Sequence, residues 1–247
     1  MTISSATLTN GSGSSATNAN SYTTSALTPT ANRLIIVQFN AVRVGGANLP
    51  TISGLSGGST LSFTQIATIT SGAYRLTSWW APTGSSPGTG TITFSLGGVT
   101  HLNGHWHVYE IDGVDLAMAT PIAQTNTGTG TGTAVSVSLS TFQSASNGTI
   151  AGCVAADPSA TWTPESSPIA WTELYDTQLS DTIGAHSTCQ SLWTPDNDPS
   201  PSTTETTSNA WGMWAAEIIA AYDTTAALPI PVGGQAPVLT TTRMVAF

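Results

Sequence analysis

The feature that most constrains the fold of this chain is an internal repeat. The segment FTQIATITSGAYRLTSWWAP (63–82) resembles WTELYDTQLSDTIGAHSTCQSLWTP (171–195), and both end in Trp-x-Pro ahead of a turn-forming stretch. In this alignment Trp80 corresponds to Trp193. Because segments repeated at such a spacing fold as repeated structural units, we expect two copies of one unit.

The similarity extends to both sides of this segment. Upstream, residues 21–40 parallel residues 134–155, each after a lead-in rich in Thr, Gly and Ser. Downstream, WHVYEI (106–111) parallels MWAAEI (213–218). The whole of each unit, and not one motif, is therefore duplicated.

Most segments have the pattern of β-strands. RLIIVQF (33–39), GTITFSL (90–96) and AVSVSLS (134–140) are rich in β-branched residues or alternate apolar and polar residues with period two. Clusters of Gly, Pro, Ser and Asp separate them. The only candidate helix, at 211–222, suits a buried strand equally well. The predicted fold class is all-β, with β-sandwich units of jelly-roll or immunoglobulin-like kind.

The repeat divides the chain into three parts. We expect a first β-sandwich unit at 1–115 and a second, homologous β-sandwich unit at 116–223. The sequence leaves open whether these tandem units are separate domains or share one core. The segment 224–247 has no counterpart in the repeat and is predicted to be an extended C-terminal arm.

The arm carries apolar residues at its end, namely Met244, Val245 and Phe247 after Arg243. A free tail has no need of them, whereas an extended segment that docks on a neighbouring surface binds through strand addition and side-chain pockets. We therefore expect these four residues to act in assembly. Return of the arm onto its own domain is the alternative.

Charge composition narrows the function classes. Only 7% of residues are charged, the net charge is −9 and the pI is near 4.4, which argues against nucleic-acid binding. No apolar run is long enough to span a membrane as a helix. A polar stretch follows Met1, so we expect no secretory signal. Cys153 and Cys189 are expected to be buried free thiols, and no cofactor is expected.

The segment HLNGHWHVYEIDG (101–113) contains the best candidates for metal ligands, His105 and His107. Residues two apart on a strand share a face, so the two imidazoles could bind a metal together. The second copy has Gly212 and Trp214 at the corresponding positions and forms the same strand without histidine. We therefore favour structural histidines over a metal site; a pH-sensitive contact is the other alternative.

Two other motifs have ordinary explanations that we favour. GLSGG (54–58) matches the G-x-S-x-G pattern around a nucleophilic Ser56, but a strand and not a helix follows it. Asp196 and Asp198 could bind calcium in a loop, although an Asx turn explains them equally well. No set of acids, or of Ser, His and Asp, has a catalytic spacing, so we assign no catalytic residue.

Three tryptophans are candidates for a glycan-binding platform: Trp79, Trp162 and Trp171. Aromatic rings bind sugars when they are exposed, but buried packing is the more common fate of tryptophan. We favour packing and keep the platform as an alternative.

With Trp-x-Pro before a turn and a VYEIDGVD strand (108–115), the chain resembles virion structural proteins of tailed bacteriophages. The likeness covers most of residues 20–222 and is to capsid decoration, head-fibre and tail-associated proteins with jelly-roll folds. It implies a non-enzymatic component of the virion, assembled in the host cytoplasm. It also implies a homo-oligomer, often a trimer, attached to a capsid or tail lattice.

Two other function classes stay open. A lectin-like adhesion module would bind cell-surface glycans through exposed tryptophans, with an affinity that survives deletion of the arm. A subunit of an extracellular filament would use its arm to complete the sheet of the next subunit. An assembly protein of the virion is instead expected to oligomerise or dock through its arm.

Overall fold

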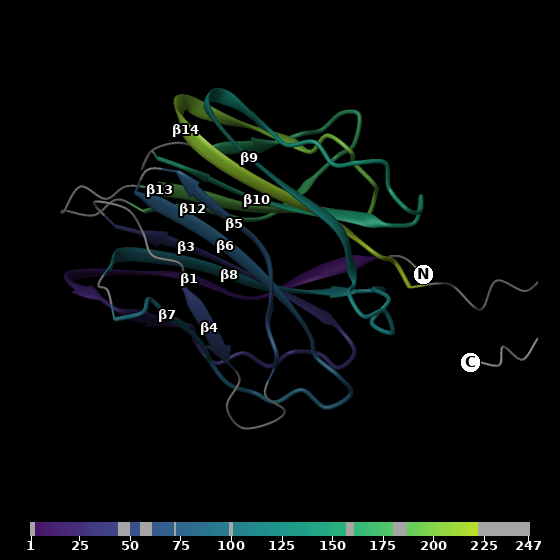
Figure 1. Ribbon diagram of the computed structural model, residues 1–247, viewed down its shortest axis with the longest axis horizontal. Helices are drawn as coiled ribbons and strands as arrows, with labels where there is room; N and C mark the ends of the chain where they lie inside the picture. Colours follow the sequence, from purple (N-terminus) through teal and green to yellow (C-terminus); the bar gives the residue numbers. More distant parts are fainter. Residues whose placement is uncertain are drawn as a thin grey trace, which may run out of the picture.

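The computed structural model describes residues 3–43, 50–54, 61–71, 73–98, 101–156, 161–179 and 187–221. In these residues every regular element is a β-strand, and all the strand pairs are antiparallel (Figure 1). The all-β prediction is therefore confirmed. The candidate helix belongs to a strand as far as Ile218.

The first large sheet comes from the N-terminal half of the chain. Its five strands, in spatial order, are β1 (Ser4–Ala19), β8 (His101–Asp112), β3 (Leu34–Val42), β6 (Tyr74–Pro82) and β5 (Thr64–Ser71). All nine residues of the central strand β3 are buried, because both faces of this sheet are covered. That explains why residues 34–37 form a continuous apolar run that does not alternate with polar residues.

The second large sheet comes from the C-terminal half. Its strands, in spatial order, are β9 (Ile122–Ser136), β14 (Ser202–Ile218), β10 (Gly148–Ala155), β13 (Ser187–Thr194) and β12 (Thr172–Leu179). The central strand β10 is likewise buried along its whole length.

The two large sheets have the same strand order and the same register. Ile36 of β3 pairs with Trp80 of β6, just as Ile150 of β10 pairs with Trp193 of β13. On the other side of β3, Ile35 pairs with Glu110, just as Thr149 of β10 pairs with Glu217 (the residue aligned with Glu110 in the sequence). The residues aligned in the sequence thus occupy equivalent places in the two sheets.

A set of short strands covers the outer face of each large sheet. In the first half these are β2 (Ser21–Thr23), β7 (Ile92–Ser95) and β4 (Thr51–Gly54), with β7 in the middle. In the second half, residues 202–205 at the start of β14 pair with the end of β9 on one side and with β11 (Trp162–Pro164) on the other.

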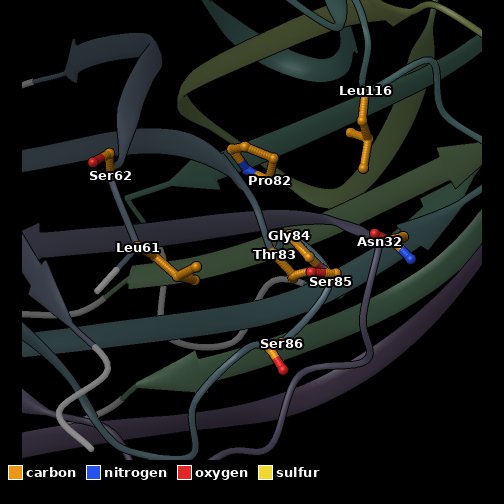
Figure 2. Close-up of a pocket in the computed structure, with 9 residues that line it drawn as sticks. All are labelled: Asn32, Leu61, Ser62, Pro82, Thr83, Gly84, Ser85, Ser86 and Leu116. Carbon is orange, nitrogen blue, oxygen red and sulfur yellow. The ribbon is translucent and has the colours of Figure 1, made fainter. Parts of the chain in front are cut away.

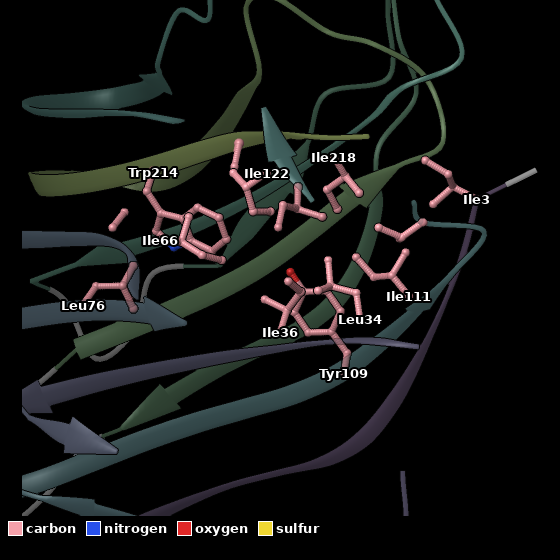
Figure 3. Packing of buried hydrophobic residues seen from close by; sticks show 14 of the residues in the cluster. Ile3, Leu34, Ile36, Ile66, Leu76, Tyr109, Ile111, Ile122, Trp214 and Ile218 are labelled. Atoms are coloured by element: carbon pink, nitrogen blue, oxygen red, sulfur yellow. The ribbon is translucent and has the colours of Figure 1, made fainter. Parts of the chain in front are cut away.

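Figure 1 shows the large sheets stacked on each other, with β4 and β7 beyond the first one. Part of the space between the large sheets is filled by an apolar core to which both halves contribute (Figure 3). Leu34 and Ile36 of β3 and Ile111 of β8 belong to it, together with Trp214 and Ile218 of β14. One further core lies on the outer side of each large sheet, under the short strands. The first outer core contains Phe39 and Phe94, and the second outer core contains Trp162 and Trp211.

Candidate functional site

The two candidate metal ligands lie between the large sheets. His105 and His107 share the face of β8 that carries Tyr109 and Ile111 into the central core, and both are fully buried. The Nε2 atom of His105 is 3.2 Å from the hydroxyl oxygen of Ser187 on β13. This contact joins the first sheet to the second.

His107 is enclosed by aromatic rings. Its ring stacks on Tyr109 of the same strand and on Tyr175 of β12, with centroid distances of 4.9 and 5.1 Å. Its Nε2 atom is 3.1 Å from Oγ1 of Thr7 on β1. Burial lowers the pKa of His107 from 6.5 to about 3 and that of His105 from 6.5 to about 4. Both imidazoles are neutral near pH 7 and act as stacking and hydrogen-bonding groups.

Further polar side chains connect the two large sheets beside the histidines. Gln38 donates from Nε2 to the backbone oxygen of Gln190 at 3.0 Å and accepts from Nε1 of Trp214 at 3.3 Å. Asn40 donates from Nδ2 to the hydroxyl of Ser187 at 3.0 Å. The layer between the sheets is therefore apolar near the start of β3 and polar further along, and each polar contact requires a particular partner.

The described residues provide no metal site around His105 and His107. Among the residues described, no three His, Cys, Asp or Glu side chains are placed to hold a metal ion. Cys153 and Cys189 are buried and unlinked, as predicted. Burial raises the pKa of both thiols well above the ordinary value, so they stay protonated and are poor nucleophiles.

The repeated glutamates, Glu110 and Glu217, form hydrogen bonds with the segments that precede the central strands β3 and β10. The carboxylate of Glu110 accepts hydrogen bonds from the backbone nitrogen and the hydroxyl of Thr30, at 2.8 and 2.6 Å. The carboxylate of Glu217 accepts from the backbone nitrogen of Gln143 at 2.9 Å and from Nδ2 of Asn147 at 2.5 Å. The same residue thus has the same structural use in both halves.

The three candidate platform tryptophans are buried, with exposed fractions of 4% for Trp79, 6% for Trp162 and 7% for Trp171. Trp79 packs near Phe94 in the first outer core. Trp171 belongs to the second outer core and donates from Nε1 to the carboxylate of Asp198 at 2.8 Å. In this structure none of the three rings offers the exposed face that a sugar platform needs.

The loop with Asp196 and Asp198, the candidate calcium site, is stabilised by its own hydrogen bonds. Asp198 is buried and accepts from the backbone nitrogen of Ser200 at 2.8 Å, the bond that defines an Asx turn, in addition to the indole of Trp171. Asp196 points to solvent. Ser56 of the G-x-S-x-G motif lies outside the described residues.

An open pocket of about 590 Å³ lies beside the segment that links the two halves (Figure 2). Leu61, Pro82 and Leu116 give it an apolar side, whereas Asn32 and residues 83–86 supply polar groups. It is large enough for one or two side chains of another segment.

The described chain ends against the segment that contributes Leu116 to this pocket. Ala220 forms an isolated β-bridge with Val114, and the backbone nitrogen of Ala221 donates to the carbonyl of Gly113 at 2.7 Å. Leu116 of the pocket is thus only two residues beyond the bridge. The predicted arm residues Arg243, Met244, Val245 and Phe247 lie outside the described residues.

The structure also assembles a polar cluster that no sequence pattern indicated. Gln190 of β13 contacts Glu173 of β12 and Thr203 of β14. The three residues come from different strands, so no local spacing reveals them. The one available signal is that the first copy has a different residue, Thr77, at the position of Gln190.

Comparisons of the chain with protein families, with curated proteins and with solved structures find no match. Among the described residues, no helix is long and apolar enough to cross a membrane. Functional inference therefore depends on the geometry of the chain itself.

Proposed function

We propose that this chain is a non-enzymatic assembly protein built from two tandem β-sandwich units of jelly-roll type and an extended C-terminal arm. In this proposal it is a capsid decoration protein, or another surface or tail-associated component, of a bacteriophage virion. Its partners are further copies of itself and a capsid or tail lattice. The virion location rests on the sequence resemblance described above.

The observation that carries the assembly role is the place where the chain leaves the fold. Ala221 hydrogen-bonds to Gly113, three residues before Leu116 in the sequence, and Leu116 lines the open pocket together with Leu61 and Pro82. Another 26 residues (222–247) follow Ala221 in the sequence. In this proposal the apolar residues Met244, Val245 and Phe247 dock in this pocket on a neighbouring copy. The identical strand order of the two large sheets supports the proposal that the chain contains two tandem units.

Solution mass tests the assembly role directly. We expect the full chain to form a stable oligomer in light scattering, and a chain that stops at Asp223 to have the mass of a monomer. Equal masses for the two chains would exclude the arm as the contact between copies.

Two matched substitutions test the pocket as the docking surface. Leu116 lines the pocket, whereas Met118, two residues away, is the one exposed large hydrophobic residue among those described. Leu116→Ser should weaken the oligomer, with a rise of about tenfold in the dissociation constant if one apolar contact is lost. Met118→Ser should leave it unchanged. An equal effect of both substitutions would contradict docking in the pocket.

A further inference from the structure

The polar cluster in the second half places a nucleophile against an amide. The hydroxyl oxygen of Thr203 is 3.0 Å from Oε1 of Gln190, and both residues are buried. The amide nitrogen Nε2 of Gln190 donates to a carboxylate oxygen of Glu173 at 2.5 Å. The amide group of Gln190 therefore has a hydroxyl next to its oxygen and a carboxylate next to its nitrogen.

We propose that Thr203 and Gln190 join in an intramolecular ester bond, formed by the folded chain without any other reactant. The inference is independent of the virion role proposed above.

The reaction balances within the chain. Oγ1 of Thr203 attacks the Cδ carbon of Gln190, and a C–O bond forms while the C–N bond breaks. The hydroxyl proton ends on the departing amide nitrogen, which leaves as ammonia. No electrons are exchanged with any other molecule, so no oxidant or reductant is needed.

The hydroxyl is placed to act as the nucleophile. Oγ1 of Thr203 is also 3.0 Å from the backbone oxygen of Thr163 on β11. A hydroxyl has one proton, so when it is donated to Thr163 the lone pairs of Oγ1 remain available to the neighbouring amide. The distance of 3.0 Å between Oγ1 and Oε1 of Gln190 places the hydroxyl beside the amide group whose Cδ carbon it would attack.

One carboxyl group for proton transfer lies at the nitrogen of the amide, and a second belongs to the residue that pairs with Gln190 on the neighbouring strand. Glu173 touches Nε2 directly, and Asp176 pairs with Gln190 across β12 and β13. Burial raises the pKa of Asp176 to about 6, with the nearby charge of Glu173 adding to the effect. Because Glu173 is exposed, protons can enter and ammonia can leave there. A carboxyl that donates to the departing nitrogen assists this kind of cleavage.

Burial of both residues would protect the ester from hydrolysis. Gln190 has no exposed surface and Thr203 only 3%, so water has little access to the ester. The bond would tie β13 of the large sheet to the start of β14 in the short-strand layer. It would therefore link the two layers around the second outer core.

The first half supplies the contrast. At the position that corresponds to Gln190, in the same register with its central strand, stands Thr77. The sandwich architecture thus forms without an amide there. Gln65 of β5 is an exposed glutamine of the first sheet and serves as the internal control.

Intact-mass spectrometry of the purified, denatured full chain tests the proposal. We expect a mass lower than that of the sequence by one ammonia, and peptide mapping after digestion at acidic residues should find the peptides of Gln190 and Thr203 joined. Thr203→Val keeps the shape but lacks the nucleophile, so it should show the full sequence mass. Gln65→Glu should still lose one ammonia.

Wild-type protein that has the full sequence mass, with the two peptides separate, would overturn the proposal. So would retention of the mass loss in Thr203→Val. If that loss then disappeared in Cys153→Ala, the nucleophile would be the cysteine paired with Gln190 across β10 and β13, and not the threonine. Mild alkali should cleave an ester and leave glutamate at position 190, which checks the linkage without any variant.

Discussion

His107 lies between the rings of Tyr109 and Tyr175 and contributes to stability only while it is neutral. Burial holds its pKa at about 3 and that of His105 at about 4, whereas both imidazoles return to about 6.5 when the chain unfolds. Below pH 6.5 the unfolded chain therefore takes up protons that the folded chain does not. The contribution of the two histidines to the free energy of unfolding is therefore fully present above pH 6.5, and it is lost as the pH decreases towards 4 and 3.

We predict that His107→Phe makes the stability less sensitive to acid. The phenyl ring keeps the stack but cannot take up a proton, so the loss of stability between about pH 6 and about pH 4 should be smaller by about 1.4 kcal/mol per pH unit. Urea unfolding of both proteins at several pH values in this range measures the difference.

Asp176 also changes the stability of the protein with pH. The effect of His107 is therefore seen only when the pH curves of the wild type and of His107→Phe are compared. Burial raises the pKa of Asp176 from 3.8 to about 6, so its contribution to stability rises as the pH falls through that range, opposite to the histidines. It is unchanged in His107→Phe and cancels in the comparison. Parallel pH curves for the two proteins would show that His107 does not titrate on unfolding.

The face on which the histidines lie could be predicted from the sequence, but their partners could not. Period-two alternation places His105 and His107 on one side of a strand, and both are buried in the structure. The second copy has Gly212 and Trp214 at the corresponding positions, which is why the sequence favours a structural role over a metal site. The partners Ser187 and Tyr175 come from the other half of the chain. Only the packing of sheet on sheet brings them together.

At the scale of elements, the close approach of the two large sheets depends on residues without side chains. A Cβ atom at Gly152 of β10 would overlap the side-chain oxygen of Gln38 and the indole nitrogen of Trp214. A Cβ atom at Gly212 of β14 would lie 2.5 Å from Cγ2 of Ile69 on β5. Side chains of the first sheet thus occupy space that these glycines leave free.

We predict that Gly152→Ala lowers the free energy of unfolding by about 1–3 kcal/mol, because Gln38 and Trp214 must move and their hydrogen bond is broken. Gly128→Ala is the matched control, since the nearest atom to its Cβ would be the backbone oxygen of Ser136 at 3.3 Å. Urea unfolding measures both. An effect of Gly152→Ala no larger than that of the control would contradict the account of sheet packing.

The strands themselves could be predicted better than their ends. The run at 33–39 becomes β3 (Leu34–Val42), and the run at 90–96 becomes the four residues of β7. The segment 211–222 was ambiguous between helix and strand because it is apolar on both faces. The pairing of β14 with β10 and β9 decides it, and that pairing is a long-range property.

At the scale of the whole molecule, the central core joins the halves. Leu34, Ile36 and Ile111 from the first half pack with Ile150 and Ile218 from the second. The sequence could not settle whether the repeats share a core, because an apolar run shows that a strand is covered on both faces but not by which element. In this fold one face of each central strand is covered by short strands of its own half and the other by the opposite half.

This shared core predicts that residues 3–221 unfold in one cooperative step. Separating the halves would expose the apolar face of each large sheet and the buried histidines, so neither half is expected to stay folded once the other has unfolded. Differential scanning calorimetry should give one transition in which the calorimetric and van't Hoff enthalpies agree. Two resolved transitions, or a chain of residues 1–115 that folds alone with a melting curve of its own, would show instead that each half is stabilised mainly by its outer core.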